Sequence, residues 1–432
     1  MSDSQIPTQG QLPDPLAPGQ IPAEQRVVQP SRSQQVIRDI MGGNAVISVL
    51  AVVLALLVGA ILIAFTDKDV QAASGYFFSR PGDTFRAIWE AASGAYSALF
   101  QGSIYNFKRP GFEAGIRPLT ETLTFATPLI AAGLGVAVAF RVGLFNIGGR
   151  GQMLVAAGAA GYVGFAWPLP FGVHLVVAVV VGMVAGAIWG AIVGVLKAYT
   201  GAHEVIVTIM LNYVAFYLIS FLLKTPGALQ APGSTNPKSP AMLETAVFPD
   251  LFGPQYNLHW GFVVAVLATV YVWYLINRSS MGFQFRAVGE NPHAALVAGI
   301  HVKKIYIYAM LISGALVGLA GVAQVLGTVT TGFSSGIDAA IGFDAITVAL
   351  LGRSRPIGVF FAGILFGALK AGGYSMQASQ GVPIDIVLVV QSMIVLFIAA
   401  PPLVRAIFRL PVPGTVKAPR TPASTRKVEV SK

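Results

Sequence analysis

Residues 182–194 read "GMVAGAIWGAIVG" and contain no charged side chain. They lie within an apolar run over 172–196, and about 20 mainly apolar residues are enough to cross a membrane as a helix. The glycines of this stretch recur every four residues and therefore share one helix face: Gly182, Gly186, Gly190 and Gly194. Because glycine has no side chain, the backbone of a second helix can come close to that face. The stretch predicts a transmembrane helix packed tightly against a neighbour.

The rest of the chain has the same character. Of its 432 residues, 55% are hydrophobic and only 11% are charged, whereas a soluble domain usually carries about 25% charged residues. A second set of glycines, Gly314, Gly318 and Gly321, suits close helix packing in another apolar run. We predict an all-α polytopic membrane protein with about ten transmembrane helices. The predicted spans are 45–65, 119–140, 151–167, 172–196, 204–223, 259–276, 305–326, 341–352, 357–372 and 384–400. The span over 341–352 is too short to cross alone, so we expect a broken or re-entrant segment there.

Charge predicts how the chain is oriented. With the N-terminus inside, 19 of the 28 Lys and Arg fall on inside segments and nine outside, with Lys370 among the outside ones. This bias predicts a cell (inner) membrane protein with both termini in the cytoplasm. The net charge of +10 is then mostly a topology signal, so we expect contacts with membrane lipids and none with nucleic acid.

Three regions can be distinguished by composition. Residues 1–40 and the basic residues 411–432 are predicted to be disordered cytoplasmic tails. Residues 41–410 form the predicted transmembrane domain, which includes a polar cytoplasmic segment over 277–304. Two long outside segments, 66–118 and 224–258, interrupt it, and the second is rich in Pro, Gly and Ser and is expected to be a loop over the extracytoplasmic mouth.

Several kinds of chemistry have no support in the sequence. There are no cysteines, and the five histidines show no metal-binding spacing, so we predict no metal site. No P-loop and no nucleophile elbow occur, so we predict that the chain is not an enzyme. The carboxylates nearest the spans are expected near helix ends: Glu121, Glu204, Asp344 and Asp385. With no acid or base near the middle of a predicted span, an ion-coupled carrier is disfavoured, although a broken helix could bring a terminal acid to the midplane.

Uncharged polar residues do occur inside one span. Asn212 lies near the centre of the span over 204–223, with Thr208 one turn earlier and Tyr213 beside it. One interpretation is hydrogen bonding between helices, which contributes roughly 0.6–2 kcal/mol for each bond. The other is the polar lining of a permeation path, and the residues alone do not separate the two.

The polar segment contains the signature of a short helix. Residues 284–301 read "QFRAVGENPHAALVAGIH", in which Asn291 is a good N-cap and Pro292 suits the first helical position. Gly299 can end the helix, which we expect to be about ten residues long. So short a helix is not stable alone in water, and Leu296 and Val297 offer apolar surface for burial. The helix therefore packs on its own bundle or on the lipid surface, or it docks into another protein.

Four stretches together resemble a known family. "GFQFRAVGENPHAALVAGI" (282–300) closely resembles the cytoplasmic coupling segment of ABC importer permeases of the branched-chain amino acid, ribose and nucleoside group. The other three are similar to the nucleoside and simple-sugar subgroup: "VGLFNIGGRGQMLVAAGA" (142–159), "GAHEVIVTIMLNYVAFYL" (201–218) and "FDAITVALLGRSRPIGVFFAGILFGAL" (343–369). The resemblance covers about residues 119 to 400. Arg150 stands where the family pattern usually has Glu, and His203 where it has Asn.

The resemblance implies sites and partners. It implies a coupling helix that sits in a cleft of a separate ABC ATPase subunit, formed by Arg286, Gly289, Glu290, Asn291 and Pro292. It also implies a translocation path formed by Asn146, Glu204, Thr208, Asn212 and Tyr213. The ATPase binds ATP, so the chain itself needs no cofactor. A second, related permease and an extracytoplasmic substrate-binding lipoprotein complete the implied assembly, with a heterodimer of permeases.

The predicted function is that of a permease subunit of an ABC importer for nucleosides, working by alternating access. Import of a simple sugar such as ribose or galactose, or of a branched-chain amino acid, is the alternative within the same class. An ion-coupled secondary carrier and a membrane scaffold without transport are the alternatives from other classes.

Overall fold

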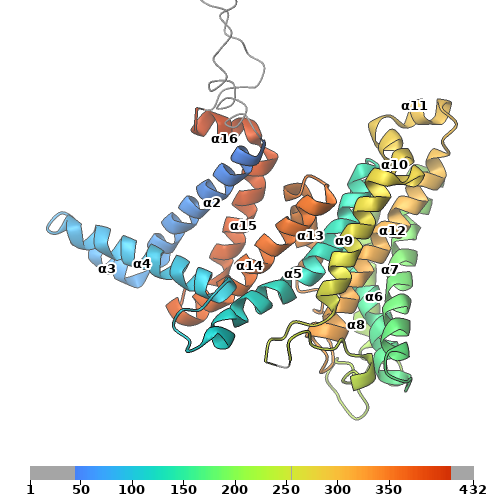
Figure 1. The fold of residues 1–432 in the computed structure, drawn as a ribbon, viewed down its shortest axis with the longest axis horizontal. Helices are drawn as coiled ribbons and strands as arrows, with labels where there is room; N and C mark the ends of the chain where they lie inside the picture. Colours follow the sequence, from blue (N-terminus) through green and yellow to red (C-terminus); the bar gives the residue numbers. More distant parts are fainter. Residues whose placement is uncertain (1–43, 254, 410–432) are drawn as a thin grey trace, which may run out of the picture. The chain divides into compact units, whose positions relative to one another are not determined.

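A computed structural model describes residues 44–253 and 255–409. The predicted tails 1–40 and 411–432 lie outside the described residues. Residues 48–404 form one compact unit. Helices and loops make up the described part of the chain, which contains a single isolated β-bridge and no strand. The predicted all-helical class is therefore confirmed for the described residues (Figure 1).

In the part of the chain that the structure describes, seven helices are long and apolar enough to cross a membrane. They are α2 (Asn44–Thr66), α5 (Phe112–Arg141), α7 (Val173–Thr200), α8 (Glu204–Leu222), α9 (Gly261–Arg278), α12 (Val302–Ala323, continued by a π-helical turn to Thr328) and α14 (Pro356–Gln380). Helix α15 (Ile384–Ala399), followed by α16 (Pro401–Ile407), makes an eighth if the two count as one bent span. Within the described residues, length and composition thus support seven or eight spans where the sequence suggested about ten.

The two remaining predicted spans form helices of a different kind. Helix α6 (Gly149–Ala166) begins with the polar turn "GRGQ", which lowers its hydropathy. Helix α13 (Ile341–Leu351) has 11 residues and is therefore about 17 Å long, whereas the hydrocarbon core is about 30 Å thick. The expectation that 341–352 cannot cross alone agrees with this length.

The segment 66–118 is helical over much of its length. It contains α3 (Lys68–Ser74) and α4 (Pro81–Ser103), and it also includes the start of α5. Helix α4 packs on α14, where a Cβ added at Gly372 would lie 2.5 Å from the carbonyl oxygen of Leu99. In contrast, the described part of 224–258 is a loop whose only helical turn is Glu244–Ala246.

The two glycine patterns meet where Gly186 packs against Gly314 and Gly318. Helices α7 and α12 run side by side, and a Cβ added at Gly186 would lie 2.5 Å from the carbonyl oxygen of Gly314 and 2.8 Å from the Cα of Gly318. At Gly190 an added Cβ would lie 2.5 Å from the carbonyl oxygen of Met310. We call this contact between α7 and α12 the glycine seam. It confirms the close approach that residues 182–194 predicted, and it identifies the partner helix (Figure 1).

Candidate functional site

A buried amide cluster lies where the chain passes from α5 to α6 without helical structure, over residues 142–148. The side chain of Asn146 is fully buried. Its Nδ2 donates to Ser313 Oγ on α12 at 2.9 Å and to Gln152 Oε1 at 3.2 Å, and its Oδ1 accepts from the backbone N–H of Gly148 at 2.9 Å. Ser313 in turn donates to the carbonyl of Gly135 at 2.7 Å. These bonds satisfy polar groups that the absence of helix leaves in the interior.

Asn212, on α8, forms hydrogen bonds to the end of this connection and to the first turn of α6. Its Oδ1 accepts from the backbone N–H of Gly151 at 2.8 Å, and its Nδ2 donates to the carbonyl of Ile147 at 3.0 Å. Thr208, fully buried one turn earlier, donates to the carbonyl of Glu204 at 2.7 Å. The structure thus brings Asn146, Thr208 and Asn212 together around the connection between α5 and α6.

The other two residues of the predicted path also lie on α8, but their side chains have different surroundings. Glu204 begins α8 and forms an ion pair of 2.8 Å with Lys197 at the end of α7. Tyr213 is 54% exposed. The assignment of all five residues to a translocation path stays a prediction.

Arg150 has a partner that the sequence did not reveal. It lies in the first turn of α6, where its Nε is 3.3 Å from Asp338 Oδ2. Its guanidinium also lies over the ring of Phe216 on α8, 4.8 Å from the centroid. Asp338 is buried in the connection that precedes α13. The positive charge at position 150 is therefore compensated inside the fold by a carboxylate 188 positions away.

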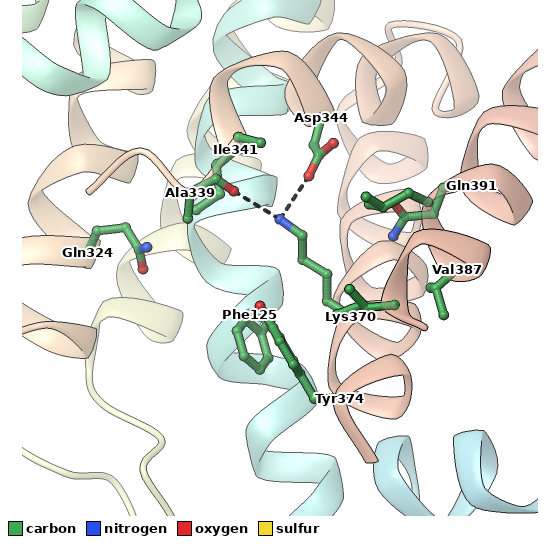
Figure 2. Close-up of a pocket in the computed structure, with 12 residues that line it drawn as sticks. Phe125, Gln324, Ala339, Ile341, Asp344, Lys370, Tyr374, Val387 and Gln391 are labelled. Carbon is green, nitrogen blue, oxygen red and sulfur yellow. Dashed lines mark hydrogen bonds and ion pairs between the residues drawn. The ribbon is translucent and has the colours of Figure 1, made fainter. Parts of the chain in front are cut away.

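Lys370 corrects the prediction that no span carries an acid or base near its middle. The span predicted to end at residue 372 continues to Gln380, which places Lys370 about 21 Å from the start of α14 and about 15 Å from its end. Its ammonium forms an ion pair of 2.8 Å with Asp344 in the first turn of α13 and donates to the carbonyl of Ala339 at 3.3 Å (Figure 2). An ionisable residue in the middle of a span is a functional candidate by default because its desolvation is costly.

A cavity of about 210 Å³ surrounds this ion pair. Figure 2 shows the Lys370 ammonium with Gln324 and Gln391 on opposite sides of it in that view. Gln391 is 3% exposed, and within the part of the chain that the structure describes its Nε2 has no hydrogen-bond partner. The rings of Phe125 and Tyr374 stack at one border of the cavity, with centroids 5.7 Å apart. We call this cavity the inner pocket.

The backbone on both sides of α13 is strained. Ala339 and Ala340 have φ of 42° and 62°, and Arg353 and Ser354 have φ of 52° and 51°. Residues other than glycine adopt such angles at a cost of about 1–3 kcal/mol each, and they persist where the surroundings hold them. Lys370 holds the first pair through the Ala339 carbonyl, and Arg141 Nε holds the second through the Ser354 carbonyl at 3.0 Å. Helix α13 therefore lies between two strained connections.

The polar segment after α9 forms two short helices, α10 (Ser280–Glu290) and α11 (Pro292–Val297). The predicted cap is confirmed, since Asn291 Oδ1 accepts from the N–H groups of His293 and Ala294 at 3.0 Å each. The predicted length is wrong: α11 has six residues because the chain turns at Ala298 and Gly299, the latter with φ of 84°. Leu296 and Val297 are 60% and 90% exposed.

The predicted residues of the polar segment divide into two groups. Arg286 donates to the carbonyl of Ile276 at the end of α9, and Gly289 lies against the backbone of Arg141 at the end of α5. These contacts attach α10 to the bundle. Glu290 and Asn291 are exposed and Pro292 is half-buried, so they lie where α10 turns into α11.

The sequence contains a signal that Lys370 lies inside a long helix, but no signal for the rest of the inner pocket. The residues after 372 are compatible with a helix up to Gln380. The first clear signal for the end of the helix is Gly381, followed by Pro383. The inner pocket as a whole joins α5, α12, α13, α14 and α15, and no local pattern indicates that these residues meet.

Together, the candidate spans, the non-helical connection held by buried amides and the mid-span ion pair are typical of a multi-pass membrane transporter. Residues 119–399 match the family described as branched-chain amino acid transport system / permease component. The chain belongs to this family. It is therefore a permease component and not an enzyme.

Three relatives illustrate the likeness. The chain is 39% identical to the guanosine ABC transporter permease protein NupP of Bacillus subtilis, over 72% of this chain and 86% of that protein. It is 35% identical to the glucose ABC transporter permease protein TsgB13 of Haloferax volcanii, over 65% and 75%. It is 33% identical to the nucleoside ABC transporter permease protein NupB of Lactococcus lactis, over 66% and 79%.

Proposed function

We propose that this chain is one permease subunit of an ABC importer for nucleosides, and that a separate ATPase drives it by alternating access. The names of NupP and NupB support the cargo. The observation that carries the mechanism is the surface of α11, where Leu296 and Val297 are 60% and 90% exposed on a helix of six residues. Ala295 packs α11 on its own chain, but these two apolar side chains beside it stay exposed, and the cleft of an ATPase subunit would cover them.

The contacts of α10 suggest how a push on α11 reaches the bundle. Gly289 rests on the backbone of Arg141, and Arg141 donates to the carbonyl of Ser354, in the strained connection after α13. Displacement of α10 and α11 would therefore act on the end of α5 and on the connection that orients α13. Packed elements shift between discrete arrangements. These contacts can therefore transmit the conformational change of the ATPase to α13.

The buried amides have a supporting role in this proposal. Asn146 and Asn212 direct both ends of their side chains at protein groups, and Thr208 bonds within its own helix. They would border the translocation path by keeping residues 142–148 out of helical form. Glu204, paired with Lys197 beside the α7–α8 connection, and Tyr213 would lie along the same path.

The orientation and the assembly belong to the same proposal. With Lys370 moved from the outside into a span, 19 Lys and Arg lie inside and eight outside, so the bias toward cytoplasmic termini in the cell (inner) membrane grows. Counting α6 and α13 as parts of the membrane domain brings the number of membrane helices to about ten. A second permease is supported by the two guanosine permease proteins of Bacillus subtilis, NupP and NupQ, which are both similar to this chain. A substrate-binding lipoprotein would deliver the cargo from outside.

The docking of α11 can be tested with two variants of the full complex. Leu296→Ser combined with Val297→Ser removes the exposed apolar surface, and we expect it to abolish co-purification of the ATPase and ATP-dependent nucleoside uptake while the permease stays monodisperse. Phe252→Ser is the matched control, since Phe252 is 64% exposed in the loop at the other end of α9. Normal co-purification and uptake in the double variant would contradict the assignment of α11.

A simple sugar is the second candidate cargo, and TsgB13 is the observation that favours it. Competition against labelled guanosine uptake by unlabelled uridine, ribose, glucose and leucine separates the candidates. We expect uridine to compete. Stronger competition by glucose would favour the sugar, and stronger competition by leucine would exclude both.

A further inference from the structure

Two cavities of the described chain meet at one pair of aromatic rings. The inner pocket, of about 210 Å³, surrounds Lys370 and Asp344. A second cavity, of about 470 Å³, lies toward α4 and the start of α5 and is lined by Arg109, Arg117 and Glu121, among others. Phe125 and Tyr374 line both. Their stacked rings, 5.7 Å apart between centroids and inclined by 28°, therefore separate an outer polar cavity from an inner one.

The inner pocket presents polar groups that suit hydroxyls. The Asp344 carboxylate accepts hydrogen bonds and the Lys370 ammonium donates them, and the two lie 2.8 Å apart. Gln391, 3% exposed, borders the same cavity with an Nε2 that has no hydrogen-bond partner among the described residues. A buried amide without a partner is uncommon in folded proteins and calls for an explanation, such as a ligand that completes it. Vicinal hydroxyls can both donate and accept, so they match this set of groups.

The border of the pocket presents different chemistry. Aromatic faces stack with the flat rings of nucleobases irrespective of base identity. Tyr374 is 52% exposed, so its ring has a free side beyond its contact with Phe125. An aromatic platform next to a polar pocket of limited size is complementary to a molecule with one flat heteroaromatic ring system and one polyhydroxylated ring.

We propose that a nucleoside in transit is held with its base against Phe125 and Tyr374 and its ribose in the inner pocket, beside Lys370, Asp344 and Gln391 (Figure 2). This inference rests on the proposed function and specifies where the cargo binds. The volume agrees with it: a cavity of about 150 Å³ accepts benzene, so about 210 Å³ accommodates one sugar ring and leaves the base at the aromatic pair.

A substrate analogue tests the ribose half. We would measure ATP-dependent uptake of guanosine and of 2′,3′-dideoxyguanosine by the complete transporter in cells, comparing wild type, Gln391→Leu and the matched control Gln377→Leu. Gln377 is exposed on α14 and lies outside the inner pocket. Loss of one neutral hydrogen bond should lower kcat/KM for guanosine by roughly 2- to 12-fold. Uptake of the dideoxy analogue should stay unchanged in Gln391→Leu, and both substrates should be unaffected in the control.

The ratio between the two substrates decides the outcome. If Gln391 only stabilises the fold, uptake of both substrates falls by the same factor, the ratio stays at the wild-type value and the proposal is overturned. If wild-type cells show no ATP-dependent nucleoside uptake at all, the proposed function itself fails. The two failures are therefore distinguishable.

Aromatic variants test the base half. Loss of stacking in Tyr374→Leu should lower kcat/KM for guanosine by about 5- to 150-fold. Tyr374→Phe, which keeps an aromatic ring, should leave kcat/KM near the wild-type value. Competition by free ribose or glucose as strong as that by guanosine would show that the pocket recognises the sugar ring alone. Combined with unchanged uptake in Tyr374→Leu, that result would overturn the assignment of the base to the aromatic pair.

Discussion

Replacement of Gly186 by alanine tests whether the glycine seam holds α7 and α12 together. The added Cβ would lie 2.5 Å from the carbonyl oxygen of Gly314 and 2.8 Å from the Cα of Gly318. Both neighbours are backbone atoms, which cannot turn aside as a flexible side chain does. An ordinary contact begins at 3.4 Å, which is 0.9 Å more than the 2.5 Å found here, so the backbone at this contact must shift to admit the methyl group.

The expected magnitude is the balance of two opposing effects. Forcing one extra carbon into a packed interface costs about 1–3 kcal/mol, whereas alanine in place of glycine favours a helix by up to about 1 kcal/mol. Gly82 provides a matched control, because it lies in α4 with nothing within 4 Å of an added Cβ. Gly82→Ala should therefore leave the protein unchanged or slightly more stable, and Gly186→Ala should be less stable than this control by about 1–3 kcal/mol.

The assay is thermal unfolding of the purified complex in detergent at one scan rate, followed by tryptophan fluorescence. A fixed rate is needed because membrane complexes often unfold irreversibly, so that the apparent Tm depends on kinetics. We expect Gly186→Ala to melt clearly below Gly82→Ala. If the two variants melt together, or if Gly186→Ala melts higher, the close approach of α7 and α12 is wrong.

Three further outcomes are expected. Asn212→Leu removes the two hydrogen bonds that its amide makes to Ile147 and Gly151 and leaves two buried backbone groups unpaired, which should cost about 2–4 kcal/mol and lower the apparent Tm in the same melting assay. Arg150→Glu places a carboxylate against Asp338 and should abolish uptake, whereas adding Asp338→Arg should restore at least part of it; an active single variant would refute the pairing. Burial lowers the pKa of His259 to about 4, below the 6.5 of an unfolded histidine, so the folded chain binds fewer protons than the unfolded chain between these values. Stability should therefore fall as the pH drops from about 6.5 to 4, by at most about 3 kcal/mol, and His259→Gln should flatten that part of the profile.

Features encoded in nearby residues could be predicted from the sequence. The cap of α11 depends on Asn291 and the two N–H groups that come within three residues of it, so its chemistry is complete within one turn. The four-residue spacing of Gly182, Gly186, Gly190 and Gly194 describes one helix face, and that face is the one that packs. The apolar runs predicted most spans because a membrane requires continuous hydrophobic length.

Features that depend on where helices end and on which helices meet required the tertiary structure. Lys370 lies near the end of the apolar run that predicted its span, and the structure places it in the middle of α14 because the helix continues to Gln380. Its ion pair with Asp344 has no signal in the sequence. The partner of Arg150 is 188 positions away, and Gln391 reaches the inner pocket from a fifth helix. A helical membrane protein, its glycine-lined helix and its capped polar segment could all be predicted, because they depend on hydropathy and on contacts within a few residues. Which charges pair and where a pocket forms could be seen only in the folded chain, because a buried charge needs a partner that is close in space, and that partner can be far away in the sequence.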